Sequence, residues 1–565
     1  MPEKKIRVLI QMRHTPELDA ALTARSFSTS IVPSMDILGL SVDESYTPVK
    51  LPNREPRERV RDMEVGRLFT FDARPEVSTY LIRGEVEDDT ALNRLIENVK
   101  QDPKGVGVFS DPRIIPFFCP ENPVGTLEAV KNLLKTSTLL ARGMDGSNVM
   151  VAIVDTGINL NLLRSTGINP KFDAKHSWSP VPDIIPGNVP VPSGIEYESL
   201  RHGTMCAFDA CIAAPNCTLL DYPLLWSQEE GGSKMEGLLS DAVKAYSNLR
   251  GLLSTDDQNK PALVVNNSWG MPHPSFDFPV RHPGNYSDNP EHPFNIIVES
   301  LEDAGADILF AAGNCGPECP SYPPCYGDPP TPIAATDRPI YGANSHPSVL
   351  CIGAVTINKV RLGYSSQGPG RLHMDKPDLC AFSHFEGSGV YPADTGTSAA
   401  CPVAAGVVAA IRSVYSPTTL TPAQLRNIAC RTSEDLGRIG FDYSHGYGVI
   451  NVPAILAAIV PLTQLQSGEV VSGTLTQTGD TAMFRMAVEN AFNTLTIELD
   501  GPEGVDFDIY VRKGGAPTIT EYDERGYTTS ADEKIRVQPV EPGEYYMLVR
   551  SYHGSGDFSI RAVLE

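Results

Sequence analysis

Three short segments carry side chains whose types could together perform nucleophilic chemistry. Asp155 follows the apolar run VAIV, His202 stands in the run RHGT, and Ser398 stands in the run DTGTSAACPVAAG. A serine hydroxyl has too high a pKa to attack a carbonyl group unaided, so it needs a nearby base such as imidazole, and that base needs a carboxylate to orient it. The three residue types therefore predict attack by a serine on a carbonyl carbon.

Taken singly, each of these residues has a commoner structural role. An Asp after a strand is usually a turn or cap residue, a lone His is usually structural, and a Ser before a helix is often its N-cap. The three nevertheless follow one another over 47 residues (155 to 202) and then 196 residues (202 to 398). Their order and spacing within one segment favour a catalytic role for all three.

The elements that must position these residues alternate in type. Strands are expected at 149–154, 218–224, 262–266, 308–311 and 349–355, and helices at 206–213, 240–249, 294–304 and 399–414. Such alternation predicts a mostly parallel sheet with helices on both faces, which places Asp155 at the carboxyl end of a buried strand. We expect this α/β domain to span residues 126–460, with Pro-rich loops at 179–192 and 317–332.

Two further regions flank this domain. Residues 1–120 contain strands at 5–12, 77–84 and 105–110 and a helix at 89–100, which fit a small α+β domain with an Arg-rich insertion at 54–61. Residues 461–565 contain short alternating strands at 482–488, 494–499, 507–511, 533–537 and 545–551, which predict a separate β-sandwich.

Composition excludes several partners. The 565 residues include 46 Lys+Arg and 69 Asp+Glu, a formal charge of -23 that disfavours nucleic acid and anionic membranes. No run of about 20 apolar residues offers a membrane span. The N-terminal residues alternate as in a strand, unlike a signal peptide, which favours a cytoplasmic location. Of the 11 cysteines, Cys315, Cys319 and Cys325 could contain a disulfide, and most others are expected to be buried thiols.

The motifs DTG, RHGT and GTSAACP resemble the subtilisin (subtilase) family, whose marks are D-T-G, H-G-T and G-T-S-M-A-x-P in that order. The resemblance implies a serine endopeptidase in which Asp155 orients His202 and His202 activates Ser398. The sequence differs from the family pattern at Ala399, Cys401 and Val403, positions that shape helix packing more than chemistry. Cys401, one turn from Ser398, is either sensitive to thiol reagents or simply a small buried residue.

Two further segments extend the resemblance. The run ILFAAGN ends in Asn314, which by likeness donates to the oxyanion, and VVNNSWG resembles the strand that pairs with substrate backbone. The expected substrate-binding residues border an extended peptide that adds as a strand; they are Ser268, Trp269, Gly270, Ala311, Ala312 and Gly313. Trp269 either walls an outer apolar subsite or packs in the core, and the pocket floor is expected within residues 338–346.

The flanking regions also show resemblances. The N-terminal region resembles a divergent subtilase propeptide, an intramolecular inhibitor cut within about residues 115–140; a retained regulatory domain is the competing interpretation. The C-terminal region, through GVDFDIYVR and GEYYMLV, resembles the bacterial pre-peptidase C-terminal domain, which points to secretion. Asp506 and Asp508 are either calcium ligands or solvated carboxylates. The chemistry needs no cofactor, and structural calcium is compatible with the family.

These inferences converge on a three-layer α/β/α peptidase domain between a small α+β domain and a β-sandwich. The expected activity is hydrolysis of peptide or protein substrates through an acyl-enzyme, with autoprocessing of the N-terminal domain. A dedicated processing protease for one peptide or partner competes with a degradative enzyme. An inactive binding scaffold is the remote alternative, since such proteins normally lose a triad residue and this chain keeps all three.

Overall fold

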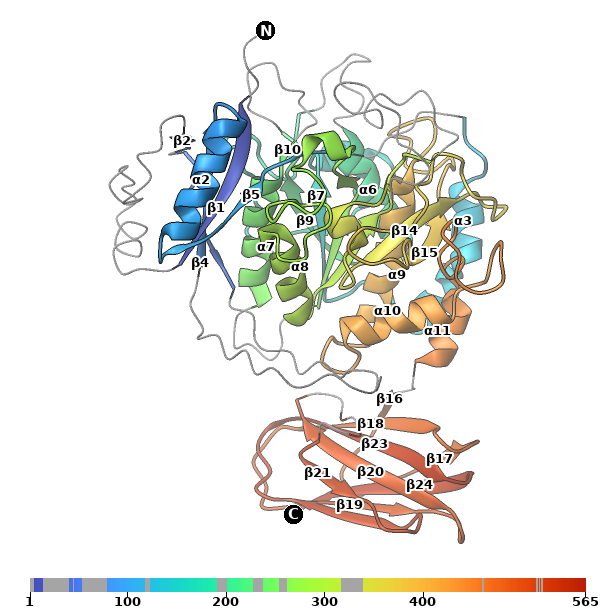
Figure 1. Ribbon diagram of the computed structural model, residues 1–565. Coiled ribbons are helices and arrows are strands. Elements are labelled where there is room, and N and C mark those ends of the chain that lie inside the picture. The colour runs from blue at the N-terminus through green and yellow to red at the C-terminus, as the bar shows by residue number, and fades with distance from the viewer. Residues whose placement is uncertain are drawn as a thin grey trace. The chain divides into compact units, whose positions relative to one another are not determined.

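The computed structural model describes residues 5–13, 40–43, 45–52, 79–116, 122–190, 201–226, 237–253, 262–316, 339–459, 462–514, 517, 519 and 522–565 (Figure 1). The chain forms two compact units. The first consists of residues 1–256, 260–414 and 433–451, and the second of residues 257–259, 415–432 and 452–565. No helix in the described ranges combines the length and the apolar character needed to cross a bilayer.

A parallel sheet of seven strands forms the centre of the first unit, in the order β15-β14-β13-β11-β7-β9-β8. The strands are β7 (Val149–Asp155), β8 (Lys171–Phe172), β9 (Thr218–Pro223), β11 (Ala262–Asn267), β13 (Asp307–Ala311), β14 (Leu350–Val355) and β15 (Leu379–Phe382). Every residue of β7, β11, β13, β14 and β15 is buried. The first four have strand neighbours on both sides, as expected for the buried strands of a parallel sheet, whereas β15 lies at the edge.

Helices pack against this sheet and carry two of the predicted site residues. They are α5 (Leu160–Ser165), α6 (His202–Cys211), α7 (Leu239–Leu253), α8 (Pro293–Asp303) and α9 (Thr397–Arg412), preceded by α3 (Leu127–Leu134) and α4 (Thr136–Ala141). Side chains of α7 and α8 share one apolar core with alternate residues of β7, β11 and β13. Helices α6 and α9 pack on one another, and α9 also lies against β11, β13 and β14.

The N-terminal segment forms a five-stranded sheet with one helix. Its strands are β1 (Ile6–Arg13), β2 (Leu40–Val42), β3 (Val49–Leu51), β4 (Thr79–Val86) and β5 (Gly105–Ser110), and its helix is α2 (Asp89–Gln101). The Asp88 side chain caps α2 by accepting from Ala91 N at 2.7 Å, and the buried residues of α2 complete the apolar core of this sheet. The Arg-rich insertion at 54–61 lies outside the described residues.

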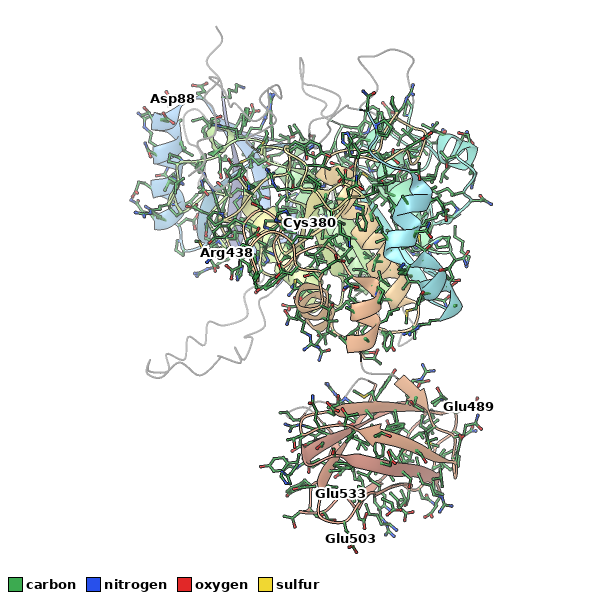
Figure 2. The ribbon with its side chains drawn as sticks, turned by 90° about the vertical axis from the view of Figure 1, so that its right-hand side faces the viewer. Asp88, Cys380, Arg438, Glu489, Glu503 and Glu533 are labelled. Carbon is green, nitrogen blue, oxygen red and sulfur yellow. The ribbon has the colours of Figure 1, made fainter. Side chains whose placement is uncertain are left out.

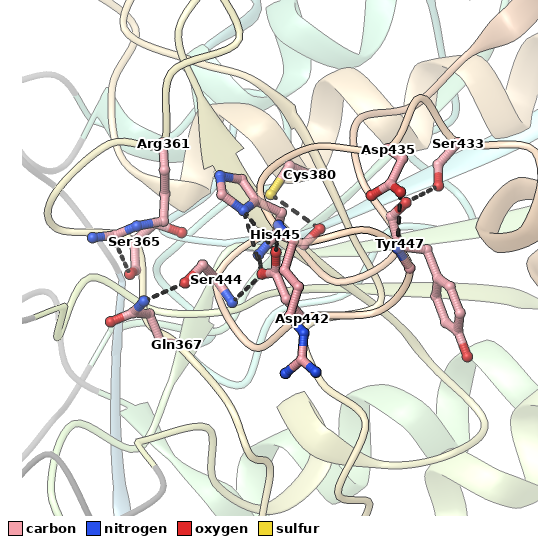
Figure 3. Close-up of polar contacts among 12 residues, drawn as sticks. Arg361, Ser365, Gln367, Cys380, Ser433, Asp435, Asp442, Ser444, His445 and Tyr447 are labelled. Atoms are coloured by element: carbon pink, nitrogen blue, oxygen red, sulfur yellow. Dashed lines mark hydrogen bonds and ion pairs between the residues drawn. The ribbon is translucent and has the colours of Figure 1, made fainter.

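A loop hairpin at 433–451 is fastened to β15 at the edge of the central sheet (Figure 3). Cys380 N donates to Gly448 O at 2.8 Å, and Ile450 N donates to Cys380 O at 2.9 Å. Asp442 organises the turn by accepting from the backbone N–H groups of Ser444 and His445 at 2.8 and 2.9 Å. These backbone bonds extend the pairing of β15 beyond its last regular neighbour.

The second unit contains two β-sheets that share one apolar core. One sheet has the order β16-β18-β23-β20-β21, and the other has the order β17-β24-β19-β22. The strands are β16 (Leu462–Gln464), β17 (Val470–Leu475), β18 (Thr481–Val488), β19 (Leu495–Asp500), β20 (Asp506–Lys513), β21 (Glu524–Gly526), β22 (Glu533–Val537), β23 (Gly543–His553) and β24 (Gly556–Leu564). Figure 2 draws the side chains of this region and labels Glu489, Glu503 and Glu533. Helices α10 (Pro422–Arg431) and α11 (Val452–Ala458) belong to the same unit.

Candidate active site

Asp155 ends β7 and is completely buried. Its Oδ1 atom accepts from Thr156 N at 2.6 Å, and its carbonyl oxygen accepts from Leu225 N at 3.1 Å. The following Gly157 has φ of 96°, a conformation that favours glycine, and turns the chain away from the strand. Asp155 therefore lies at the carboxyl end of a central strand, as its sequence position predicts.

His202 is the first residue of α6 and is also completely buried. Its Nδ1 atom lies 2.7 Å from Asp155 Oδ1, so the carboxylate fixes the orientation of the imidazole ring. The helix start is anchored by Gly203 N, which donates to Thr156 Oγ1 at 2.9 Å. A Cβ atom at Gly203 would lie 2.5 Å from Gly157 O, so glycine is needed for this approach.

Ser398 is the second residue of α9, two positions after the Gly396 cap with φ of 80°. Its Oγ donates to the carbonyl oxygen of Ser268 at 3.2 Å, and Ser268 Oγ donates back to the Ser398 carbonyl oxygen at 3.0 Å. This reciprocal pair joins the start of α9 to the segment that follows β11. The unsatisfied N–H groups of a helix start can stabilise an anion formed beside Ser398.

Asn314 is held by the same turn. Its Oδ1 accepts from Thr397 N at 2.9 Å and from Thr397 Oγ1 at 3.0 Å, which leaves the donating Nδ2 end of the amide directed away from Thr397. Thr397 Oγ1 also accepts from Gly313 N at 3.1 Å. The residue before Ser398 thus orients Asn314, a link that no local motif indicates.

A strand of the chain itself lies where the sequence predicts that a substrate strand would bind. A three-stranded sheet has the order β10-β6-β12, in which β6 (Arg113–Pro116) lies between β10 (Gly237–Leu238) and β12 (Trp269–Gly270). In the antiparallel register, Gly270 pairs with Ile115 and Trp269 pairs with Pro116. Ile114 pairs with Gly237 and is completely buried. The N-terminal segment therefore adds a strand to the edge where the sequence predicts substrate.

Trp269 has a buried indole and belongs to the core. Its ring lies 5.3 Å from Phe310 and 5.9 Å from Phe294, measured between centroids. The structure thus favours core packing for this side chain, while its backbone pairs with β6. In the segment expected to floor the pocket, the Asn344 side chain donates to Trp269 O at 2.9 Å and to Ala311 O at 2.8 Å. Asn344 thereby ties together the two segments expected to border the substrate.

Cysteines also lie around the site. Cys206, one turn after His202, places its Sγ 3.8 Å from His202 Nδ1 and 3.8 Å from Asp155 Oδ2, and sequence reasoning missed it. Burial, with Asp155 adding to it, raises the pKa of the Cys206 thiol. Cys401 is buried with its Sγ 3.8 Å from Asn267 O, which favours its role as a small packed residue. Cys315 is disulfide-bonded.

Asp155, His202 and Cys206 are the one group of three or more possible metal ligands within the described ranges, with ligand atoms inside 4.8 Å of one another. One nitrogen and one sulfur do not fit calcium, which takes six to eight oxygen ligands. Asp508, one of the carboxylates considered for calcium, is buried and accepts from Tyr510 OH at 3.0 Å. Structural calcium therefore stays a prediction from the family resemblance.

A serine at a helix start, a buried Asp–His pair and the carboxyl edge of a parallel sheet are the parts that an α/β serine hydrolase site combines. Residues 146–448 match the model of the subtilase family, and the chain belongs to that family of serine peptidases. Residues 480–551 match the bacterial pre-peptidase C-terminal domain. This match agrees with the two β-sheets of residues 462–565, called the β-unit below.

Several known proteins are similar to this chain. An extracellular protease of Xanthomonas campestris pv. campestris is 30% identical over 230 residues, covering 38% of this chain and 39% of the relative. The halolysin-like extracellular serine protease Nep of Natrialba magadii is 28% identical, covering 40% and 46%. Subtilisin E of Bacillus subtilis is 26% identical, covering 65% and 79%. The chain thus spans less than half the length of the first two relatives.

Solved structures also match, and one of them is a C-terminal domain. It is the pre-peptidase C-terminal domain of a collagenase from Bacillus anthracis, at 16% identity and a TM-score of 0.16, covering 18% of this chain and 95% of that chain.

Proposed function

We propose that this chain is a serine endopeptidase that hydrolyses peptide bonds through an acyl-enzyme on Ser398. The observation that carries the proposal is the buried 2.7 Å contact between Asp155 Oδ1 and His202 Nδ1, with Ser398 at the start of the helix that packs on the His202 helix. An orienting carboxylate, an imidazole base and a serine nucleophile are the three parts that acyl transfer requires.

Each residue has one role in the proposed reaction. His202 takes the proton of Ser398 as the hydroxyl attacks the scissile carbonyl carbon, and later gives that proton to the leaving amine. Asp155 holds the imidazole and stabilises its charged form. Asn314 Nδ2 and the backbone N–H of Ser398 donate to the oxyanion of the tetrahedral intermediate. A water molecule then attacks the acyl-enzyme, gives a proton to His202, and releases the product as His202 returns a proton to Ser398. No cofactor takes part.

The N-terminal segment is proposed to act as an intramolecular inhibitor that is removed by autoprocessing. The pairing of β6 with β10 and β12 supports this, because a substrate adding as a strand would need the same edge. Asp111 strengthens the docking by accepting from Ser240 N at 2.8 Å near the start of α7. With this role we also propose the domain organisation: a three-layer α/β/α peptidase domain lies between a propeptide-like α+β domain and a β-sandwich in the sequence.

The register of β6 also narrows the proposed cut. Ser398 Oγ donates to the carbonyl of Ser268, which precedes β12 directly, and β6 runs antiparallel to β12 toward Ser268. Because β6 approaches Ser398 as it runs toward Pro116, the register favours a cut that follows Pro116 closely. We expect the new N-terminus to fall between residues 117 and 122, at the start of the wider range 115–140 expected from sequence.

A fluorophosphonate serine probe tests the activity. Wild type should take up one probe per chain, and Ser398→Ala should take up none. Intact mass should show release of the N-terminal segment from wild type alone. If wild type labels but keeps its full length, the peptidase proposal stands and the segment is a retained regulatory domain. If wild type fails to label with or without added calcium or a thiol reductant, the inactive-scaffold alternative replaces the proposal.

The structure and the relatives also support proposals for the substrate range of the enzyme and for its compartment. A fully buried side chain at Ile114 supports selection for an apolar residue in a bound strand, which favours a processing enzyme over an unselective degradative one. The two relatives named as extracellular support export, as does the disulfide at Cys315, because disulfides persist in oxidising compartments. Detection of the mature chain in cell or medium fractions decides between export and a cytoplasmic location.

A further inference from the structure

Asp209 is a buried carboxyl group that the proposed reaction does not use. It lies on α6 seven residues after His202, so two helical turns place both side chains on the same face. Its side chain is completely buried. Among the described residues, no N–H group and no hydroxyl group donates a hydrogen bond to either of its oxygens. An ionised carboxylate in such a place would lose its hydration without compensation.

The group that Asp209 contacts is a second carboxyl group, that of Asp394. Asp394 is equally buried, but its two oxygens accept from Ser388 N at 2.5 Å and Ser388 Oγ at 2.6 Å. Those donors stabilise a negative charge on Asp394, and Asp209 lacks any equivalent. The chemistry of the two sites therefore divides the pair into a protonated Asp209 and an ionised Asp394.

The position of Asp394 connects this pair to the nucleophile. Asp394 stands four residues before Ser398, in the loop that delivers Ser398 to α9. Its backbone is fixed in that loop, because Asp394 N donates to Phe385 O at 2.9 Å and His384 N donates to Asp394 O at 2.7 Å. Space for the carboxylate is made by Gly387, where a Cβ atom would lie 2.1 Å from Asp394 Oδ2.

We propose that Asp209 and Asp394 share one proton, and that this hydrogen bond positions the loop carrying Ser398 against the helix carrying His202. Both residues act through their neighbours and touch no reacting atom, so they are positioning residues. The inference rests on the proposed function, since it concerns the alignment of the same serine and histidine. It adds that this alignment requires the proton that the two carboxyl groups share.

The surroundings agree with one negative charge on the pair. Burial raises the pKa of Asp209 well above its usual value, with the Asp394 charge adding to the effect. Burial also raises the pKa of Asp394 to about 6, against the lowering effect of the Ser388 donors. The other titratable groups that interact with the pair come from α6 and from the 383–396 loop; they are Cys206 and Cys211, which interact with Asp209, and Tyr391, which interacts with Asp394.

Loss of the shared proton would leave two carboxylates in buried contact, and their repulsion would separate the loop from α6. The rate of fluorophosphonate labelling should therefore fall at least tenfold on the alkaline side in wild type. In Asp209→Asn the amide still donates to Asp394 but carries no titrating proton. This variant should label within about threefold of wild type at neutral pH and lose the alkaline fall.

Two further variants separate the hydrogen bond from simple packing. Asp209→Val keeps an apolar filling but has no donor, so its labelling should be at least tenfold slower than that of Asp209→Asn at neutral pH. Asp183→Asn, at an exposed position, is the matched control and should follow wild type at every pH. Equal labelling of the Val and Asn variants, or an unchanged alkaline fall in Asp209→Asn, would overturn the proposal.

A measurement that does not depend on activity completes the test. In the full-length Ser398→Ala chain, a proton held by the native pair but released on unfolding makes the melting temperature fall as pH rises above about 4. Asp209→Asn should make this fall shallower, and an unchanged slope would contradict the shared proton. A shallower slope, together with a wild-type chain that never labels, would support the pair while refuting the peptidase proposal, so the two failures are distinguishable.

Discussion

At the scale of single residues, the candidate site depends on side chains that hold other side chains. Asp155 orients His202, and Thr397 orients Asn314 through two contacts to its Oδ1 atom. All four residues are completely buried, where hydrogen bonds are stronger than in water and unmade ones are costly. Small changes of orientation should therefore have large effects on rate.

Asn314 and Thr397 provide a graded test of this dependence. Asn314→Ala removes a donor to the oxyanion and should lower kcat about 10²–10³-fold with little change in KM, a magnitude known from subtilisin itself. Thr397→Val keeps the backbone contact but removes the hydroxyl, so about a tenfold loss is expected. Steady-state kinetics on a peptide substrate measures both. Equal activity of Asn314→Ala and wild type would remove Asn314 from the proposed mechanism.

At the scale of elements, one buried ion pair joins α9 to β13 at the ends remote from Ser398. Arg412 Nε and Nη2 donate to the two carboxylate oxygens of Asp307 at 2.5 and 2.8 Å. Both side chains are buried, so the loss of one partner leaves an uncompensated charge. The pair therefore fixes the helix that carries Ser398 against the sheet in which β7 ends at Asp155.

Arg412→Met should lower the free energy of unfolding by about 3–5 kcal/mol, because it leaves the Asp307 carboxylate buried and alone. Urea unfolding of the Ser398→Ala chain measures this without self-digestion. The double variant Arg412→Met/Asp307→Leu should recover most of the loss, since no charge then remains. A single variant as stable as its parent would show that the pair adds nothing to the packing of α9.

The docking of β6 is a second element with a direct test. Ile114 is completely buried among apolar side chains of the first unit, and an ionised carboxylate there costs several kcal/mol. In the full-length Ser398→Ala chain, Ile114→Asp should speed amide hydrogen exchange in segments 113–116 and 268–271 at least tenfold. Ile185→Asp, at a side chain that is 59% exposed, is the control and should leave exchange unchanged. Unchanged exchange in Ile114→Asp would contradict the proposed role of β6 as the inhibitory strand.

At the scale of the whole molecule, the two units have separate cores. The core of the β-unit consists only of residues from Leu465 onward, and its strands pair mainly with neighbours inside 462–565. Antiparallel strands with a shared apolar face do not need the other unit for their hydrogen bonds. The matched pre-peptidase C-terminal domain therefore has the features of an independently folding module.

A fragment of residues 462–565 should fold without the rest of the chain. We expect a single cooperative urea transition with a slope of about 1–3 kcal/mol/M, the range typical of small domains. Circular dichroism and tryptophan-free tyrosine fluorescence can follow the same transition. A fragment without a cooperative transition would mean that this unit requires contacts from outside 462–565.

The sequence by itself predicted most strands of the central sheet and singled out Asp155, His202 and Ser398. Strand 105–110 and strand 533–537 have the predicted bounds, and β7, β11 and β13 end within one residue of prediction, because buried strands show as local apolar runs. The helix expected at 206–213 instead begins at His202 and ends at Cys211, since its start is set by the contact between Gly203 and Thr156. Local patterns do not contain such a contact.

Only the tertiary structure decided which elements and side chains contact one another. It placed β6 on the edge of β12, buried the Trp269 indole against Phe310, and brought Asp209 to Asp394 across 185 residues of chain (209 to 394). Asp209 stands in the otherwise apolar run MCAFDACIAA, which indicates a buried helix but does not identify Asp394 as its partner. The physical reason is that apolar periodicity and turn residues act within a few positions, whereas burial, charge pairing and edge occupancy arise only when distant segments pack together.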